Sequence, residues 1–273
     1  MENNNLAGEC PQKGRIFNNL SFCLDKEGIE MYAKQVKIGE EVKLVTKCGV
    51  YNGVRINNPD EMLSLEEKRK IFDEFYPVAV MAFGQNKSRD FERDVFDHLF
   101  KVKILILAFN DGIKYKNGGI ERGVAFATYT DFSVDGRLVV YNEGTAVDPL
   151  FQGEGFYQAF NRCIVDEFEY FTARTQNPVI ITAMSKIGEV VPVQRAPNEL
   201  ELKILERLAV KTNMPDYDFN QHLCRNFYGG RLNAIKPRIG NKISMKMNEK
   251  LNIDNGDCIL ALSKINKIKD YTW

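Results

Sequence analysis

The sequence has little of several features that would place it in a particular class of protein. It has only two histidines and one tryptophan in 273 residues, and 37 basic side chains balance 37 acidic ones, so that the formal net charge is zero. Proteins that bind nucleic acid through its phosphates usually carry a net positive charge. The charge therefore argues against nucleic acid as a partner, and the ordinary hydrophobic content of 44% argues against a disordered chain.

Other absences concern metals, disulfides and membranes. The six cysteines include no Cys-x-x-Cys pair, so we expect reduced thiols and no metal site. The longest apolar runs, residues 78–83 and 104–109, are too short to span a bilayer. The first residues lack the basic and apolar regions of a signal peptide. Together these observations predict a soluble protein of the cytoplasm.

The hydrophobic pattern that is present alternates between the periods of strands and helices. Short apolar or alternating runs predict strands, and apolar residues spaced by three and four predict helices. The expected strands are residues 42–51, 102–109, 124–132, 137–147, 179–184, 242–247 and 258–265. The expected helices are one that begins after Ser64, one that begins near Ser88, and residues 156–171, 198–210 and 219–228.

Local signals predict where some of these elements begin and end. Ser64 and Glu67 have the spacing of a capping box, and Pro77 is expected to end the helix that they begin. Asp135-Gly136 between two apolar runs predicts a tight hairpin. Asn52-Gly53 predicts a turn at the end of the first strand.

These elements predict one α/β domain with a mixed, mostly antiparallel sheet. Residues 102–147 would form an antiparallel meander of three strands. The helix at 156–171 would then cross over to a parallel strand at 179–184, as a right-handed crossover unit does. We place this domain at residues 41–273 and interpret residues 1–40, which show no clear pattern, as an N-terminal extension of unknown role.

A glycine-containing loop joins the third meander strand to the crossover helix. Its sequence, TAVDPLFQGEGF at residues 145–156, places Gly153 and Gly155 beside the expected helix start. Glycine lets the backbone bend and approach a ligand closely, and the first amides of a helix have no internal acceptors and lie in a positive potential. Such a loop suits a diphosphate, and a plain helix start with flexible turn residues is the alternative.

The spacing V-x-P-x-x-Q-G-x-G at residues 147–155, followed by an aromatic residue, resembles the acyl-CoA-binding motif of the GCN5-related N-acetyltransferase (GNAT) superfamily. The resemblance implies a GNAT-like fold over residues 42–265, with acetyl-CoA or another acyl-CoA as co-substrate. It also implies that the strands flanking the motif splay apart and admit pantetheine. The implied contacts are Thr145, Ala146 and Val147 with pantetheine, and Phe151, Gln152, Gly153, Glu154, Gly155 and Phe156 with the pyrophosphate.

The segment Asn142-Glu143-Gly144 lies just before this motif. A glycine that interrupts a strand often marks a bulge, and a bulge here would splay the strand from the one expected at 179–184. A simple irregularity of the strand is the alternative.

Direct attack of an amine on a thioester, which the resemblance implies, needs a base for the amine and an acid for the leaving thiolate. Glu143 is the candidate base, because it lies on the splayed strand and partial burial would raise its pKa. A surface glutamate is the alternative. Tyr228 resembles the position of the family's acid, and Tyr217 is the fallback. Tyr141 and Ser185 are candidate contacts of the substrate or pantetheine, and neither histidine lies near the loop in the sequence.

The sequence therefore predicts an N-acyltransferase, most simply one that transfers acetyl from acetyl-CoA to a primary amine. One alternative uses longer chains from acyl-CoA or from an acyl-carrier protein, which the basic tract at 231–250 would attract, although a solvated surface is the favoured explanation of that tract. Another alternative is a non-catalytic binding module with a degenerate fold. Leu150, Glu154 and Tyr157, which depart from the family motif, motivate this last interpretation.

Overall fold

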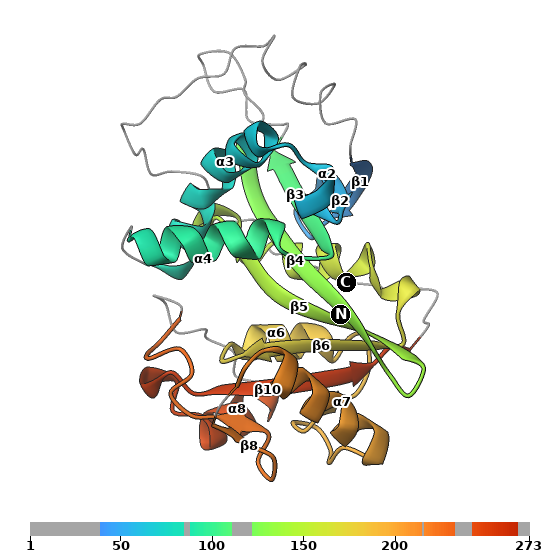
Figure 1. Ribbon diagram of the computed structural model, residues 1–273. Coiled ribbons are helices and arrows are strands. Elements are labelled where there is room, and N and C mark those ends of the chain that lie inside the picture. The colour runs from blue at the N-terminus through green and yellow to red at the C-terminus, as the bar shows by residue number, and fades with distance from the viewer. Residues whose placement is uncertain (1–38, 85–87, 111–121, 215, 233–241, 267–273) are drawn as a thin grey trace, which may run out of the picture.

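Figure 1 shows the protein as a computed structural model, which describes residues 39–84, 88–110, 122–214, 216–232 and 242–266. A twisted sheet runs through the whole of the described part. Strands β3 (Ile104–Asn110) and β4 (Arg122–Val134) run steeply in this view, whereas β6 (Tyr170–Thr175) and β10 (Cys258–Lys264) lie across it. The right-handed twist of successive strands accumulates in this way over a wide sheet.

The described strands form one sheet with the order β1-β2-β3-β4-β5-β6-β10-β9-β8, and β7 pairs with β10 off this path. Every pair is antiparallel except β5 with β6, which is parallel. The predicted mixed, mostly antiparallel sheet with one parallel crossover is confirmed. The remaining strands are β1 (Glu40–Val45), β2 (Val50–Asn57), β5 (Arg137–Val147), β7 (Val190–Val191), β8 (Tyr217–Asp218) and β9 (Leu223–Cys224).

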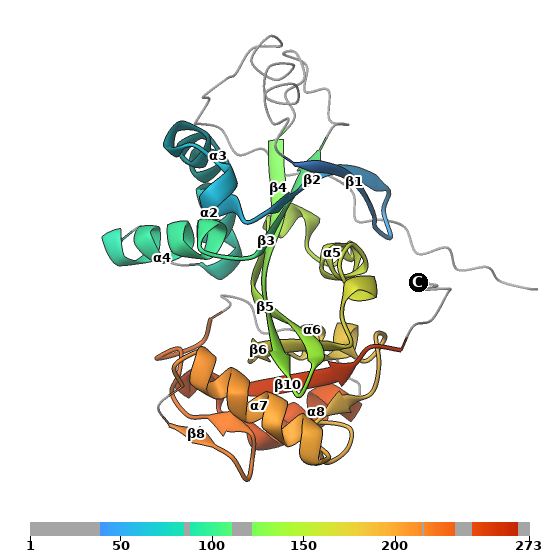
Figure 2. The same ribbon diagram turned by 45° about the vertical axis from the view of Figure 1, so that its right-hand side comes forward.

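Helices cover both faces of the sheet. The α-helices of the described residues are α2 (Pro59–Met62), α3 (Leu65–Phe83), α4 (Arg89–Phe100), α5 (Phe156–Arg162), α6 (Pro178–Met184), α7 (Glu199–Lys211) and α8 (Lys242–Lys250). Single 3₁₀ turns are η1 (Pro149–Phe151), η2 (Val165–Glu167) and η3 (Ile253–Asn255). In Figure 2, α3 and α4 lie on one side of β3 and β4, and α5 lies on the other.

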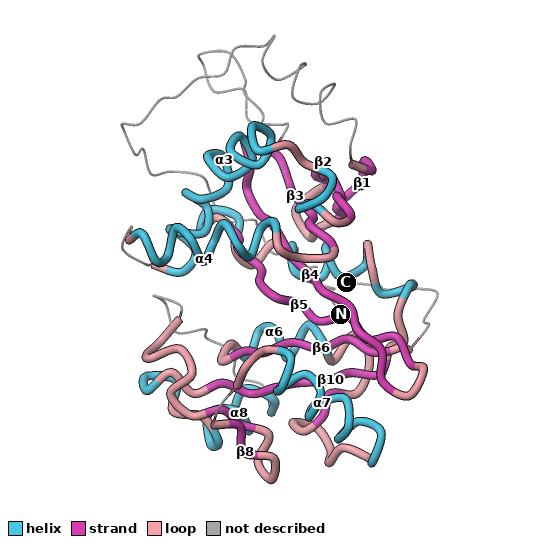
Figure 3. The backbone as a smooth tube through the Cα atoms, viewed as in Figure 1, coloured by secondary structure: helices cyan, strands magenta, loops and turns pink. Residues whose placement is uncertain are grey.

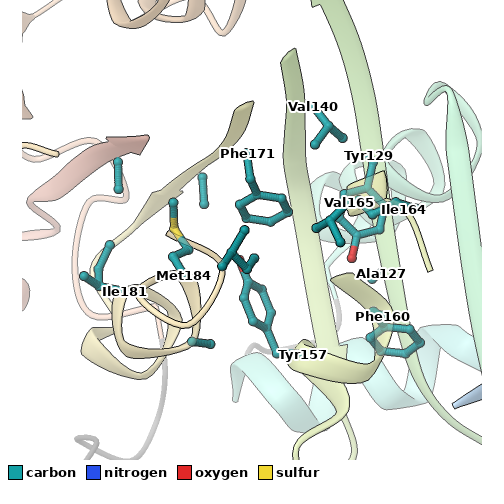
Figure 4. Packing of buried hydrophobic residues seen from close by; sticks show 14 of the residues in the cluster. Ala127, Tyr129, Val140, Tyr157, Phe160, Ile164, Val165, Phe171, Ile181 and Met184 are labelled. Carbon is teal, nitrogen blue, oxygen red and sulfur yellow. The ribbon is translucent and has the colours of Figure 1, made fainter. Parts of the chain in front are cut away.

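The face that α5, α6 and α8 cover carries a continuous apolar core. Phe160 from α5 and Met184 from α6 are fully buried in it, and Phe171 of β6 packs between these two helices and the sheet. Figure 4 shows Phe171 beside Tyr157 of α5, with Val140 of β5 above and to the right of them. Burial of such large side chains is the main favourable contribution to the stability of this half of the molecule.

The opposite face is covered in two parts. Helices α3 and α4 pack on β2, β3 and β4, whereas α7 packs on β5, β6 and β10. The alternation along β4 shows that both parts lie on one face: Phe126 belongs to the first cluster, and Thr130, four residues on, pairs with Tyr141 of the second. The boundary between the two covers therefore runs across β4 and β5.

Several local predictions are confirmed. Ser64 and Glu67 form a complete capping box at the start of α3, and Ser88 caps α4 through the Phe91 amide. Asp135 and Gly136, with φ of 49° and 78°, make the tight hairpin between β4 and β5. Positive φ at both central residues is what a type I′ turn requires.

Two predictions near the N-terminal end of the described part are wrong. Asn52-Gly53 lies inside β2, and the turn is formed by residues 46–49 instead. Gly53 is needed within the strand because a Cβ there would lie 2.9 Å from the Leu107 carbonyl oxygen of β3. Pro77 does not end α3, which continues to Phe83. Burial of the apolar face of α3 against the sheet offsets the hydrogen bond that a proline removes.

The crossover is shorter than predicted, and its strand comes earlier. Helix α5 ends at Arg162, and the parallel strand is β6, whereas residues 179–184 form helix α6. Pro178 is the first residue of α6, where proline is favoured, and Asn177 caps it. The spacing of the aromatic residues predicted which side chains are buried but not where the helix ends. Residues 179–184 were predicted as a strand because a short apolar run does not distinguish a strand from a buried helix.

The C-terminal part also differs from the prediction. Residues 219–228 do not form a helix: they follow the short strand β8 and contain the short strand β9 between loops (Figure 3). Residues 242–247 belong to helix α8 rather than to a strand, whereas the strand predicted at 258–265 is confirmed as β10. Met247 of α8 is buried while Lys246 and Met245 are exposed, so the segment has a helical apolar stripe that its brevity concealed.

Candidate functional site at the end of β5

Strand β5 loses one of its two neighbours halfway along its length. Its parallel pairing with β6 runs only from Val139 to Asn142, whereas its pairing with β4 continues to Val147. The register with β4 shifts at the same point, because Thr128 faces Gly144 while Tyr129 faces Asn142. Glu143 is therefore the extra residue of a bulge. The predicted bulge is confirmed, and the strand from which β5 splays is β6 rather than residues 179–184.

The loop after β5 begins with a buried aspartate. Asp148 accepts a hydrogen bond from the Leu150 amide at 2.9 Å and another from the Arg122 guanidinium at 3.1 Å. Its backbone amide donates to the Val124 carbonyl of β4. These contacts fix the start of η1 and hold the loop at the open end of β5.

The second half of the loop leaves backbone amides without acceptors. Gly153 and Gly155 have φ of 87° and 99°, which side-chain-bearing residues rarely adopt, and Gly155 is the N-cap of α5. Within the part of the chain that the structure describes, the amides of Gly153, Gly155 and Phe156 donate to no acceptor. A Cβ at Gly153 would meet no atom within 4 Å. The loop thus presents free donors beside open space at a helix start.

The side chains of the loop point away from these amides. Glu154 accepts a hydrogen bond from the Tyr51 hydroxyl of β2, and Phe156 packs against the same tyrosine at 4.7 Å between ring centroids. Leu150 is 70% exposed. Tyr157 is buried against Phe171 in the core under α5 and α6. The three departures from the family motif therefore leave the amides accessible.

The open edge of β5 comprises residues 143–147. Thr128 and Asn142 side chains donate to the Gly144 carbonyl, and the Gln152 side chain donates to the Val147 carbonyl at 3.2 Å. Ala146 is fully buried under α3 and α4. Of the residues predicted to pair with pantetheine, Thr145 and Ala146 have no strand on their β6 side, because the β5–β6 ladder ends at Asn142.

Glu143 and Tyr141 both lie on the face shared by α4 and α7. Glu143 accepts a hydrogen bond from Thr130 at 2.8 Å and is partly exposed. Tyr141 is fully buried, and its hydroxyl has no partner among the described residues. Burial raises the pKa of Tyr141 well above its ordinary value, so this hydroxyl keeps its proton and can only donate or accept a hydrogen bond at neutral pH.

Tyr228 lies in the loop after β9, not on a helix, and the structure brings it to β6. Its hydroxyl accepts a hydrogen bond from Arg174 Nε at 3.2 Å. Burial raises the pKa of Tyr228, with Arg174 opposing the shift, so the phenol is protonated at neutral pH. Tyr217, the fallback, is hydrogen-bonded to His222 at 3.1 Å instead.

Ser185 stands elsewhere. It ends helix α6, and its hydroxyl donates to the Thr182 carbonyl at 2.8 Å. The predicted role assumed that it ended a strand across the gap from β5, and that strand is a helix.

The structure adds one group that the sequence interpretation set aside. His98, near the end of α4, lies over the bulge: a Cβ at Gly144 would be 3.8 Å from His98 Cδ2. Its Nδ1 lies 2.9 Å from the Asp94 carbonyl oxygen and 3.4 Å from the Asp94 carboxylate. Nδ1 is therefore the protonated nitrogen of the neutral ring, and Nε2 carries the lone pair. The i,i+4 spacing of Asp94 and His98 was visible in the sequence, but their proximity to Glu143 was not.

Electrostatics around His98 favour its charged form. Burial alone would lower the pKa of His98, but the hydrogen bond and charge of Asp94 and the charge of Glu143 raise it above 6.5. The same interaction lowers the pKa of Asp94. His98 and Glu143 thus place two acid–base groups at the start of the opening between β5 and β6.

The predicted basic tract at 231–250 is only partly described, because residues 233–241 lie outside the described part. Arg231 pairs with Asp254, and the Lys246 ammonium donates to the Val193 carbonyl. No group of three or more potential metal ligands occurs in the described residues. None of the helices that the structure describes is long and apolar enough to cross a membrane.

Comparisons with known proteins match at the level of solved structures. No protein-family model and no curated protein matches the chain. A putative arylalkylamine N-acetyltransferase from the mosquito Aedes aegypti is 10% identical with a TM-score of 0.41, over 85% of this chain and 98% of that chain. The ribosomal-protein-S18-alanine N-acetyltransferase of Escherichia coli is 12% identical with a TM-score of 0.37, over 81% and 99%.

A third match is N-acetylglutamate synthase from Neisseria gonorrhoeae in complex with coenzyme A, which is 11% identical with a TM-score of 0.35, over 79% of this chain and 35% of that chain. Identity of this order does not carry the activity of these proteins over to the present chain. The bulged strand β5, its single parallel neighbour and the glycine loop that leads into α5 form the GNAT-like arrangement that the sequence motif predicts.

Proposed function

We propose that the protein is a CoA-dependent N-acyltransferase, most simply one that transfers acetyl from acetyl-CoA to a primary amine. The observation that carries this proposal is the opening between β5 and β6 directly before a loop with free amides. An extended chain such as pantetheine fits beside the unpaired edge of a strand, and a diphosphate fits free amides at a helix start. Both features occur in sequence order along residues 143–156.

The residues present fit such a ligand. The amides of Gly153, Gly155 and Phe156 would hold the pyrophosphate without lysine or arginine, and Thr145 and Ala146 would pair with pantetheine. The Glu154 carboxylate, a charge that would oppose a diphosphate, is held by Tyr51. Acyl-CoA would supply the activated acyl group as a thioester.

The chain's own residues would then move two protons. His98 Nε2 or the Glu143 carboxylate would accept the proton of the attacking amine, directly or through water. Nitrogen bonds to the acyl carbon, the carbon–sulfur bond breaks, and the leaving sulfur needs a proton. The Tyr228 hydroxyl can donate it, because Arg174 occupies its oxygen lone pair and leaves the O–H available. Tyr228 would later regain a proton from water.

Binding of acetyl-CoA to the full chain, followed as a shift in melting temperature, tests the proposal. Gly153→Glu should weaken binding by about 100-fold or more, because it places a carboxylate beside the diphosphate. Gly136→Glu is the matched control: Gly136 has a similar φ of 78° and equally open surroundings, but it lies at the other end of β5. Equal acetyl-CoA binding by wild type and Gly153→Glu would refute the site.

The same measurement with acyl-CoAs of increasing length separates the enzymatic alternatives. A short-chain enzyme loses affinity or turnover with long chains, whereas an enzyme for long chains gains both. Release of free CoA that depends on an added amine distinguishes an enzyme from a non-catalytic module. Binding of acetyl-CoA without amine-dependent release would favour the module.

A further inference from the structure

Arg174 of β6 lies where the opening between β5 and β6 begins. It directly follows Ala173, the last β6 residue that pairs with β5. Its guanidinium carbon lies 4.1 Å from the centre of the Phe227 ring, and its Nε donates to the Tyr228 hydroxyl. Stacking of arginine on an aromatic face is favourable, so Phe227 and Tyr228 hold the guanidinium at the edge of the opening.

Arg174 differs from other partly buried arginines in its partners. Arg55 and Arg195 each make a two-pronged contact with a carboxylate, that of Glu167 and Glu201 respectively. Arg174 donates through Nε alone, and in the part of the chain that the structure describes neither of its Nη groups has an acceptor. A carboxylate or another planar anion matches this free pair of donors in shape and charge.

A second donor without a partner lies on the same face. Tyr141 pairs in register with Thr172, and Arg174 is two residues further along β6, so both side chains lie on the same side of the sheet. The two groups are close enough to interact electrostatically. The buried Tyr141 hydroxyl has no hydrogen-bond partner among the described residues, which is unfavourable unless a ligand supplies one.

The opposite side of the opening carries the other sign of charge. Glu143 follows Asn142, the last β5 residue paired with β6, and thus stands across from Arg174. Asp94, on α4, lies beside His98 above the bulge. A positive group is therefore favoured near β5 and α4, and a negative group is favoured at β6. A ligand with both charges a few bonds apart satisfies the two sides together.

We propose that Arg174 and Tyr141 bind a carboxylate of the acceptor, and that the acceptor is an amino acid or a close analogue whose amine receives the acyl group. The proposal rests on the proposed N-acyltransferase function and names its substrate class. An amine without a carboxylate would leave Arg174 without an anion, and it would be a poor acceptor.

The test compares the standard amino acids with their amides and with the corresponding amines that lack the carboxylate. Turnover is measured as release of free CoA from acetyl-CoA, and binding is measured by calorimetry without acetyl-CoA. We expect wild type to prefer at least one amino acid over its amide by about tenfold or more, the effect of a charged hydrogen bond. In Arg174→Gln the preference for the amino acid over its amide should fall close to unity. Turnover of both acceptors can fall together, because Arg174 also holds the Tyr228 hydroxyl, so the ratio of the two acceptors is the readout.

Two controls keep the outcome decisive. Arg207→Gln changes an exposed arginine on α7 and should keep the preference for the amino acid. Arg174→Lys keeps the charge but lacks the planar pair of guanidinium donors, and it should retain part of the preference. If acetyl-CoA raises the melting temperature of Arg174→Gln as much as that of the wild type, the variant is folded. A wild type that binds and acylates no amino acid better than its amide overturns the proposal, as does a preference that survives in Arg174→Gln. If release of free CoA still depends on an added amine in that case, the N-acyltransferase function stands and only the substrate class fails.

Discussion

A glycine with positive φ lies at each end of β5, but the two glycines have different roles. At one end Gly136, with φ of 78°, closes a hairpin in which β5 is bordered by β4 and then by β6. At the other end Gly153, with φ of 87°, lies in a loop beside a β5 edge that has lost β6. Both glycines have open surroundings. The comparison teaches that glycine allows the turn, whereas the loss of the neighbouring strand creates the site.

The largest expected effect separates the chemistry at the two ends. At least one of Glu143→Gln and His98→Gln, both at the open end, should lower kcat/KM about 100-fold or more, since a positioned base contributes on this order. Glu169→Gln removes the exposed ion pair with Arg137 at the closed end and should leave kcat/KM unchanged. Steady-state assays with acetyl-CoA and an accepted amine measure this. If all three variants had similar kcat/KM, the acid–base chemistry could not be assigned to the open end of β5.

A pH profile tests which group at the open end is the base. The pKa of His98 is raised above 6.5 by Asp94 and Glu143 against the effect of burial. A base must be deprotonated, so kcat/KM should rise with pH through a midpoint above 6.5. Asp94→Asn removes the carboxylate that contributes most to raising this pKa and leaves the Glu143 charge in place, so the midpoint should move to lower pH. A midpoint that stays in place in Asp94→Asn would assign the base role to Glu143 or to water.

Alanine substitutions at the two glycines compare stability with binding. Gly136→Ala and Gly153→Ala each force a side-chain-bearing residue into positive φ, which should lower the free energy of unfolding by about 1 kcal/mol in either case. Only Gly153→Ala should also weaken acetyl-CoA binding, roughly fivefold, because its methyl group would occupy the space beside the free amides. Urea unfolding and ligand titration measure the two quantities. A loss of affinity in Gly136→Ala would contradict the comparison.

The smallest expected effect concerns the carboxylate inside the loop. Tyr51→Phe removes the hydrogen bond that holds Glu154 away from the amides. It should weaken acetyl-CoA binding about two- to threefold and lower the free energy of unfolding by about 1 kcal/mol. Adding Glu154→Gln to Tyr51→Phe should restore the affinity, since no charge then opposes the diphosphate. A double-mutant cycle separates this coupling from general destabilisation.

The sequence predicted the central meander well because its signals are local. The strands around Asp135-Gly136 and the capping box at Ser64 depend on residues within four positions of one another, and the structure confirms them. Residues 156–184 were harder to predict, because Phe168 and Phe171 continue the spacing of α5 although the helix has ended. Tertiary burial placed these aromatic residues in one core through three different elements, so periodicity alone misled.

The candidate site divides in the same way. The bulge at Glu143 and the glycine loop are encoded by neighbouring residues, and both could be read from the chain. The approach of His98 and Arg174 to that bulge could not, since 45 residues separate His98 from Glu143 along the chain. Their proximity depends on how α4 packs on the sheet and on where the β5–β6 ladder ends.

By itself the sequence determined the fold class, the position of the bulge and the loop in which backbone amides stand free. These follow from glycine, capping and alternation, which act over a few residues. Only the tertiary structure decided which strand separates from β5. It also decided that a guanidinium whose Nη groups have no acceptor among the described residues, a buried phenol and an aspartate–histidine pair lie near the opening. Contacts between distant segments are set by the packing of whole helices and strands, and no short stretch of sequence records them.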